Sequence, residues 1–275
     1  MIKIMLDSSS DSHNTHPYDY YIPLTVDIGG RCYKDGVDLR PQKFYKLLAS
    51  TGDFPKTSQP SPDDFIPYFE EVKANGDELI YITVSSALSG TFQSGNIAKA
   101  MVEYDGIHIV DSKSVTHMIG QLARYADQLR GDGLSATEIV EKVLQLREKQ
   151  VIFAGLQTLE YLHKGGRLSK SSAAVGTIAN IKPIISISQD GMVESAAKAI
   201  GVKRAISTIV KHVQEYEIDE NFEVWILYTV DEENCDALEA ALTAAGVSIT
   251  GRMQVGPTIG THVGPGVYGI TFIKK

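Results

Sequence analysis

Apolar and polar positions in the first half of the chain follow the rhythm of an α/β protein. Continuous apolar runs at 2–6, 79–84 and 107–110 predict strands that are buried on both faces, as in a parallel sheet. Apolar residues recur with helical spacing at 41–49, 62–74, 91–104, 114–129 and 135–149. Helices that connect parallel strands imply right-handed crossovers, so we expect a doubly wound parallel sheet.

The second half has a different rhythm, in which strands follow one another more often. Extended runs at 184–188 and 193–199 flank Gln189-Asp190-Gly191, which is a hairpin signature. Other strands are expected at 151–155, 223–230, 248–255 and 267–273, and helices at 158–163, 171–180, 202–216 and 232–245. This mixture predicts an α+β domain with a mostly antiparallel sheet. We therefore expect an α/β domain at 1–150 and an α+β domain at 151–275.

Polar residues follow three strands of the first half, at 7–11, 85–91 and 111–114. Open parallel sheets bind ligands beyond the carboxyl ends of their strands, so these clusters are expected to share one ligand-binding edge. The segment 85–91 reads Ser-Ser-Ala-Leu-Ser-Gly-Thr and lies between a strand and a helix. Such a junction favours an anion, here met by hydroxyl groups. Ordinary N-capping by a single serine is the alternative.

Three further stretches are rich in hydroxyl groups or glycine. At 56–62, helix entry explains Ser61 and Pro62 but leaves Thr57 and Ser58 without a role. At 164–169, two glycines either present Arg167 or simply end a helix. The stretch 256–266 predicts a fixed, irregular loop whose only titratable residue is His262, which has a structural role as its alternative.

Composition excludes several classes of protein. The chain has 275 residues, 43% of them hydrophobic, and a net charge of −8, which argues against nucleic acid or an anionic membrane surface as a standing partner. Its apolar runs are far shorter than the ~20 residues of a membrane-spanning helix, and its start does not resemble a signal peptide. Cys32 and Cys235 lack metal-ligand spacing, so a reduced, cytoplasmic setting is expected.

Catalytic and metal-binding patterns receive little support from the sequence. Ser89, His262 and either Asp7 or Asp111 can be written as a triad, but no Gly-x-Ser-x-Gly elbow occurs. His13 and His16 lack the spacing of a metal site, and no P-loop or Gly-x-Gly-x-x-Gly is present.

Eight segments together resemble the DegV family of bacterial fatty-acid-binding proteins. They include Asp-Ser-Ser-Ser-Asp at 7–11, Gly-Gly-Arg at 165–167 and Gly-Thr-His-Val-Gly-Pro-Gly at 260–266. The full set, in the family's order, is 7–11, 33–38, 57–62, 85–94, 110–112, 158–162 with 164–167, 180–184 and 260–266. The resemblance covers the whole chain, and eight segments in order are far more specific than one.

The resemblance implies a non-catalytic carrier that needs no cofactor or metal and binds a long-chain fatty acid between its two domains, with the tail in an apolar tunnel chiefly in the second domain. Carried over by position, Thr57, Ser89 and His262 bind the carboxylate, and the same pocket is lined by Ser58, Ser86, Gly90 and Thr91. The expected partner is the kinase subunit of a fatty acid kinase, which forms an acyl phosphate from the presented ligand. Arg167 is similar to a residue implicated in docking that kinase or in aiding the transfer, and transient membrane contact is compatible with this role.

Two departures from the family and two rival functions qualify this expectation. Ile200 stands where the family often has an arginine, which weakens the case for kinase docking. Residues 114–117 read Ser-Val-Thr-His where glycines are common, which would reshape one pocket wall. A Ser/His acyl hydrolase or transferase that uses the same pocket is the enzymatic alternative, and a lipid-sensing regulatory protein is the other.

Overall fold

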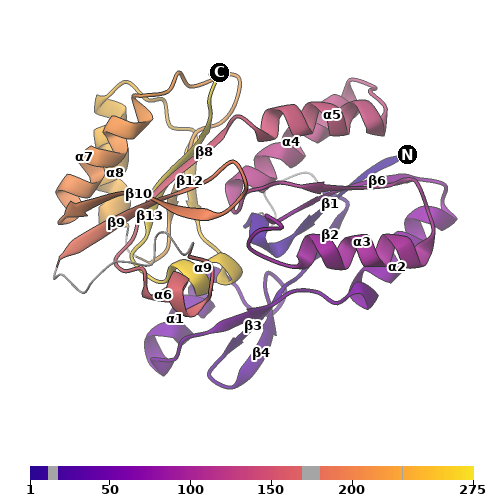
Figure 1. Ribbon diagram of the computed structural model, residues 1–275, viewed down its shortest axis with the longest axis horizontal. Helices are drawn as coiled ribbons and strands as arrows, with labels where there is room; N and C mark the ends of the chain where they lie inside the picture. Colours follow the sequence, from indigo (N-terminus) through magenta and orange to yellow (C-terminus); the bar gives the residue numbers. More distant parts are fainter. Residues whose placement is uncertain (12–17, 169–179, 231) are drawn as a thin grey trace.

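The computed structural model describes residues 1–11, 18–168, 180–230 and 232–275, which form two large sheets and one small one (Figure 1). The first sheet has the order β2-β1-β6-β7, and all its neighbouring strands are parallel. Its strands are β1 (Ile2–Asp7), β2 (Tyr20–Ile22), β6 (Glu78–Thr83) and β7 (Ile107–Asp111).

Helices cover both faces of this parallel sheet, as its apolar strands require. Alternate residues of β1 point to opposite faces, so Met5 packs with α2 (Pro62–Ala74) and α3 (Thr91–Val102). Leu6 packs instead with α4 (His117–Gly131) and α5 (Ala136–Arg147). The predicted doubly wound sheet is therefore confirmed.

The second sheet has the order β10-β9-β8-β13-β11-β12 and is antiparallel except for the pair β11 and β12. Its strands are β8 (Gln150–Gly155), β9 (Ile181–Ile187), β10 (Val193–Ile200), β11 (Trp225–Tyr228), β12 (Gly251–Gln254) and β13 (Tyr268–Ile273). One face is covered by α7 (Val202–Val213) and α8 (Glu233–Ala244), in agreement with the predicted α+β part. The predicted helix at 171–180 lies almost entirely outside the described residues.

A third sheet, antiparallel and of three strands, packs against helices near both ends of the chain. It consists of β4 (Arg31–Lys34), β3 (Thr25–Ile28) and β5 (Lys56–Ser58). Beside it lie α1 (Pro41–Thr51), α6 (Glu160–Lys164) and α9 (Pro257–Val263), which Figure 1 shows below the second large sheet. Because α9 packs on β3, β5 and α1, the end of the chain folds back onto its beginning. The division at residue 150 remains a prediction.

The stretch 256–266 was expected to be an irregular loop, and that expectation is wrong. It contains α9, which begins at Pro257, ends at Val263 and is capped by Gly264, a residue with φ of 73°. Gly260 lies on the side of α9 that faces α1, where a Cβ atom would come within 2.6 Å of the Tyr45 hydroxyl. Glycine is thus needed here for close packing between helices.

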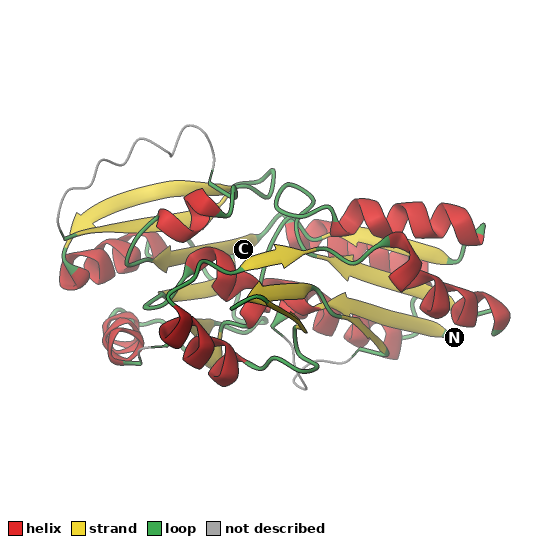
Figure 2. Cartoon of the chain, turned by 90° about the horizontal axis from the view of Figure 1, so that it is seen from below, coloured by secondary structure: helices red, strands yellow, loops and turns green. Residues whose placement is uncertain are grey.

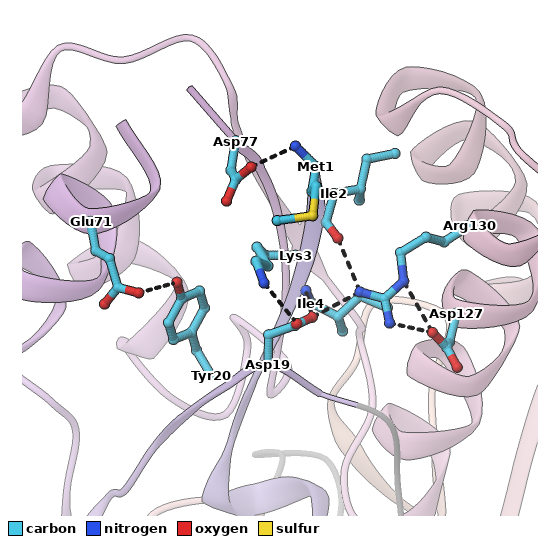
Figure 3. Close-up of polar contacts among 10 residues, drawn as sticks. All are labelled: Met1, Ile2, Lys3, Ile4, Asp19, Tyr20, Glu71, Asp77, Asp127 and Arg130. Carbon is cyan, nitrogen blue, oxygen red and sulfur yellow. Dashed lines mark hydrogen bonds and ion pairs between the residues drawn. The ribbon is translucent and has the colours of Figure 1, made fainter. Parts of the chain in front are cut away.

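The two ends of the parallel sheet differ in chemistry. At the amino end, Asp19 accepts hydrogen bonds from the backbone of Ile4 and from Arg130, and Arg130 also pairs with Asp127 (Figure 3). This network ties β1 to α4. The carboxyl end carries the serine-rich segments instead. Figure 2 shows that the strands of both large sheets lie along the length of the molecule. No described helix has the length and hydropathy needed to cross a bilayer.

Candidate functional site

A largely apolar cavity lies between the loops at the carboxyl end of the parallel sheet and the face of the second sheet opposite α7 and α8. Its walls include Leu88, Ile152, Ile185, Val193, Leu227 and Val267. Strands β8 to β11 supply one wall, the loops that follow β1, β6 and β7 supply another, and residues of β5, α6 and α9 complete the lining. Val115 and Thr116 are in the wall that the loops supply, so the unusual segment at 114–117 does border the cavity.

Thr57, Ser89 and His262 all border this one cavity, although they come from distant parts of the chain. Thr57 lies on β5 and His262 in the last turn of α9, and their side chains meet with 2.8 Å between Oγ1 and Nε2. Only the packing of α9 on β5 brings these two residues together.

Ser89 occupies the turn between β6 and α3, as the sequence predicted. Its hydroxyl lies 2.9 Å from the hydroxyl of Thr91, and it also accepts the Thr91 backbone N–H. Gly90 packs against Gln59, where a Cβ atom would lie 2.1 Å from Oε1, so a larger residue would displace that side chain.

Arg167 is half-buried and borders the cavity, which makes it the single cation among the described lining residues. Its Nε donates to the carbonyl of Leu88 at 3.0 Å, and its Nη1 donates to the carbonyl of Gly165 at 2.5 Å. The side chain therefore anchors the turn that carries Ser89. The expected role of Arg167 in docking a kinase subunit stays a prediction. The expected weakening of that docking by Ile200, which is 65% exposed at the end of β10, also stays a prediction.

Burial lowers the pKa of His262 from its usual 6.5 to about 4, and the charge of Arg167 adds to this effect. The imidazole is therefore neutral at pH 7. Its Nδ1 has no hydrogen-bond partner among the described residues and faces Gly165, where a Cβ atom would lie 2.4 Å from it. The ring is held tightly between Thr57 on one side and Gly165 on the other.

The four residues expected to line the same pocket lie beside the cavity, outside the described lining. Ser58 follows Thr57 on β5, so its exposed side chain points to the opposite face. Ser86 is also exposed and binds Asp111 through its backbone and its hydroxyl. Gly90 and Thr91 lie outside the cavity lining and support the position of Ser89 in its turn.

The three strand-end clusters do meet at one edge, as predicted. Asp7 at the end of β1 accepts the backbone N–H of Val84, which follows β6, at 2.7 Å. Asp111 at the end of β7 accepts the backbone N–H of Ser86 at 3.0 Å. Backbone pairing of the parallel strands brings these clusters together, and their carboxylates then fix the loops.

The geometry does not assemble the serine triad. Ser89 pairs with Thr91, His262 pairs with Thr57, and the Nδ1 of His262 has no carboxylate beside it in the described part of the chain. Asp7 and Asp111 are occupied by the loop backbones. The described residues also contain no group of three or more side chains that could hold a metal ion; His13 and His16 lie outside them.

The family model described as "Uncharacterised protein, DegV family" matches residues 1–275. The chain belongs to the DegV family. A DegV domain-containing protein of Caldanaerobacter subterraneus subsp. tengcongensis is 38% identical over 280 residues, covering 100% of this chain and 99% of the relative. Another, from Clostridium acetobutylicum, is 30% identical over 279 residues, with 100% and 99% covered.

Solved DegV structures share the whole fold. A fatty acid binding DegV family protein from Streptococcus agalactiae superposes with a TM-score of 0.88 at 26% identity, covering 100% of this chain and 99% of that one. A DegV family protein from Thermus thermophilus, described for its fatty acid binding, gives 0.87 at 29% identity with the same coverage. DegV of Bacillus subtilis, a fatty acid binding protein, gives 0.83 at 26% identity, again with 100% and 99% covered.

Sequence reasoning missed most of this DegV cavity. The aliphatic wall residues of β8 to β11 have no distinguishing pattern, because any core strand would show the same side chains. It also missed Asp11 and Asp35, which are buried and bind the backbone at the start of α9. Both residues lie within segments that resemble the family, at 7–11 and 33–38. Their position in these segments was the signal that could have marked the two acidic residues for a buried, structural role.

Proposed function

We propose that this protein binds a long-chain fatty acid, with the carboxylate at Thr57, Ser89 and His262 and the acyl chain in the apolar cavity. The observation that carries the proposal is the arrangement of these three polar side chains around one largely apolar cavity. An amphipathic ligand with a single polar end fits such walls. The fatty acids bound by the related proteins have this form.

Neutral donors can still bind a carboxylate when their protons are aligned. If His262 carries its proton on Nε2 and donates it to Thr57, the Thr57 hydroxyl is left to donate to the ligand. Thr91 can support Ser89 in the same way. Two short donor chains would then end at the carboxylate, and Arg167 would add a nearby positive charge.

The tail supplies most of the affinity in this proposal. Burying a chain of ~16 carbons at about 0.8 kcal/mol per methylene gains on the order of 12 kcal/mol before the cost of association. Hydrogen bonds to a charged group add about 1.5–3 kcal/mol each. The carboxylate site therefore mainly fixes the orientation of the ligand.

Mass spectrometry of a denatured extract of the purified protein tests the proposal directly. We expect a co-purified fatty acid of about one equivalent, which delipidation removes and added palmitate replaces. An extract without fatty acid, combined with no binding of added palmitate, would overturn it.

We further propose that the protein is a cytosolic carrier without chemistry of its own. The pairing of His262 with Thr57, away from Ser89, supports this over an acyl hydrolase. Incubation with acyl esters separates the two functions. Retention of intact fatty acid is expected, whereas turnover that is lost in Ser89→Ala would favour the hydrolase.

The last step of the proposal is presentation of the bound carboxylate to a kinase subunit that phosphorylates it from ATP. Hydroxyl donors neutralise the carboxylate less than a bidentate arginine would, so it keeps the electron density needed to attack phosphorus. With the cognate kinase, acyl phosphate formation should fall in Ser89→Ala and His262→Ala. Unchanged rates in both variants would exclude this role for the site.

A further inference from the structure

Helix α9 carries His262 but is too short to fix its own position. It has seven residues, and helices of this length are not stable in isolation. His262 lies five residues after Pro257, so any shift in the first turn is carried directly to the imidazole. Whatever holds the start of α9 therefore decides where His262 lies.

Two buried carboxylates hold that start. Asp11 accepts the backbone N–H of Gly256 with 2.9 Å between N and Oδ1. Asp35 accepts the backbone N–H of Thr258 with 3.0 Å between N and Oδ2. Both acceptors come from the first 35 residues of the chain, and their exposed fractions are only 6% and 0%.

Burying two acidic side chains close together is unfavourable, because each loses hydration and each repels the other. Burial raises the pKa of Asp11 well above its usual value, and the charge of Asp35 raises it further. Apolar residues would fill this space at lower cost. What the carboxyl groups provide instead is directional acceptance of two N–H groups at the first turn of a helix.

We infer that Asp11 and Asp35 are positioning residues of the carboxylate site: they fix the first turn of α9 and thereby hold His262 against Thr57. The inference rests on the proposed fatty acid function, because it concerns the same site. The inference gives a role to the segments 7–11 and 33–38. Their described hydrogen bonds do not reach the three residues proposed to bind the carboxylate.

The test compares the affinity of each variant for palmitate and for hexadecanol, which has the same tail without the carboxylate. The ratio of the two affinities reports head-group recognition and cancels general effects on the tail cavity. Asp35→Ala should lower this ratio about tenfold, the same loss that we expect for His262→Ala. Asp35→Asn keeps an oxygen that can accept the Thr258 N–H and should stay within about twofold of the parent protein.

A double-mutant cycle then separates positioning from general destabilisation. Asp35→Ala combined with His262→Ala should lose no more of the ratio than His262→Ala alone. Additive losses, or equal losses for both ligands in Asp35→Ala, would overturn the inference. If an alanine variant at either position does not fold, Asp11→Ser or Asp35→Ser takes its place in the test, because serine keeps a polar group. If the parent protein binds neither ligand, the proposed function itself fails.

Discussion

A single hydroxyl at the cavity should have a measurable effect on binding and little on folding. Ser89 is half-buried and borders the cavity, and its hydroxyl is one of the three groups that we propose bind the carboxylate. Ser89→Ala should weaken palmitate binding about tenfold, since one hydrogen bond to a charged group is lost. Fluorescence displacement of a bound fatty acid probe measures this, with thermal unfolding as the check on folding.

Ser58→Ala is the matched control, because Ser58 is exposed and lies on the far side of β5 from the cavity. Its affinity should equal that of the parent protein. Parent-like binding by Ser89→Ala, or an equal loss in both variants, would contradict the placement of the carboxylate.

The histidine at the site also makes stability depend on pH. The folded protein holds the pKa of His262 at about 4, below its usual 6.5, so between these values the unfolded chain binds more protons. Stability due to the neutral imidazole is complete above pH 6.5 and is lost as the pH falls toward 4. Between pH 7 and pH 5 this should remove about 1–2 kcal/mol of unfolding free energy.

Urea unfolding of the parent protein and of His262→Gln at both pH values isolates this contribution. Burial raises the pKa of Asp7 to about 6, which acts in the opposite direction over the same range. Asp7 is present in both proteins, and its effect therefore cancels in the difference. A difference that does not change between pH 7 and pH 5 would show that His262 is not held in a dry site.

At the scale of elements, the fit between α6 and α9 can be tested through one glycine. Gly165 at the end of α6 has α-helical φ and ψ, so its backbone accepts alanine. The added methyl group would lie 2.4 Å from Nδ1 of His262 and must push the ring aside. Gly165→Ala should therefore reduce palmitate affinity about tenfold, measured by isothermal titration calorimetry.

Gly131→Ala is the corresponding control at the end of α4, where nothing lies within 4 Å of the added atom. It should leave affinity unchanged and raise the unfolding free energy by about 0.5–1 kcal/mol. Normal binding by Gly165→Ala would mean that the position of the ring does not matter to the ligand.

Most helices and strands could be predicted from the sequence because their apolar spacing is strong. The structure places α2 at Pro62–Ala74, the predicted range, with Ser61 and Asp64 forming a capping box. In contrast, α4 begins at His117, three residues later than expected, after Thr116 with φ of 53°. Helix α9 was missed entirely, since contacts with distant carboxylates and not local spacing define it.

At the scale of the whole molecule, the ligand should connect both large sheets. The cavity takes its walls from β8 to β11 and from the loops of the parallel sheet, so an acyl chain would contact both. Ligand at a free concentration of about 100 times Kd adds about 2.7 kcal/mol to the free energy of unfolding. For a chain of this size, Tm should then rise by about 5–10 °C.

Differential scanning calorimetry of delipidated protein with palmitate or with acetate measures that rise. Acetate has the carboxylate without the tail and should leave Tm unchanged at the same concentration. Equal shifts for the two acids would show that the tail does not enter the cavity.

The sequence alone determined the order and type of most elements, the edge where the polar clusters meet and the identity of the three candidate ligands Thr57, Ser89 and His262. These follow from local spacing, strand order and ordered family segments. Only the tertiary structure decided that Thr57 meets His262 at 2.8 Å, that Arg167 anchors the Ser89 turn and that two buried aspartates hold α9. Those contacts join residues far apart in the chain, and local patterns contain no information about which distant partners pack together.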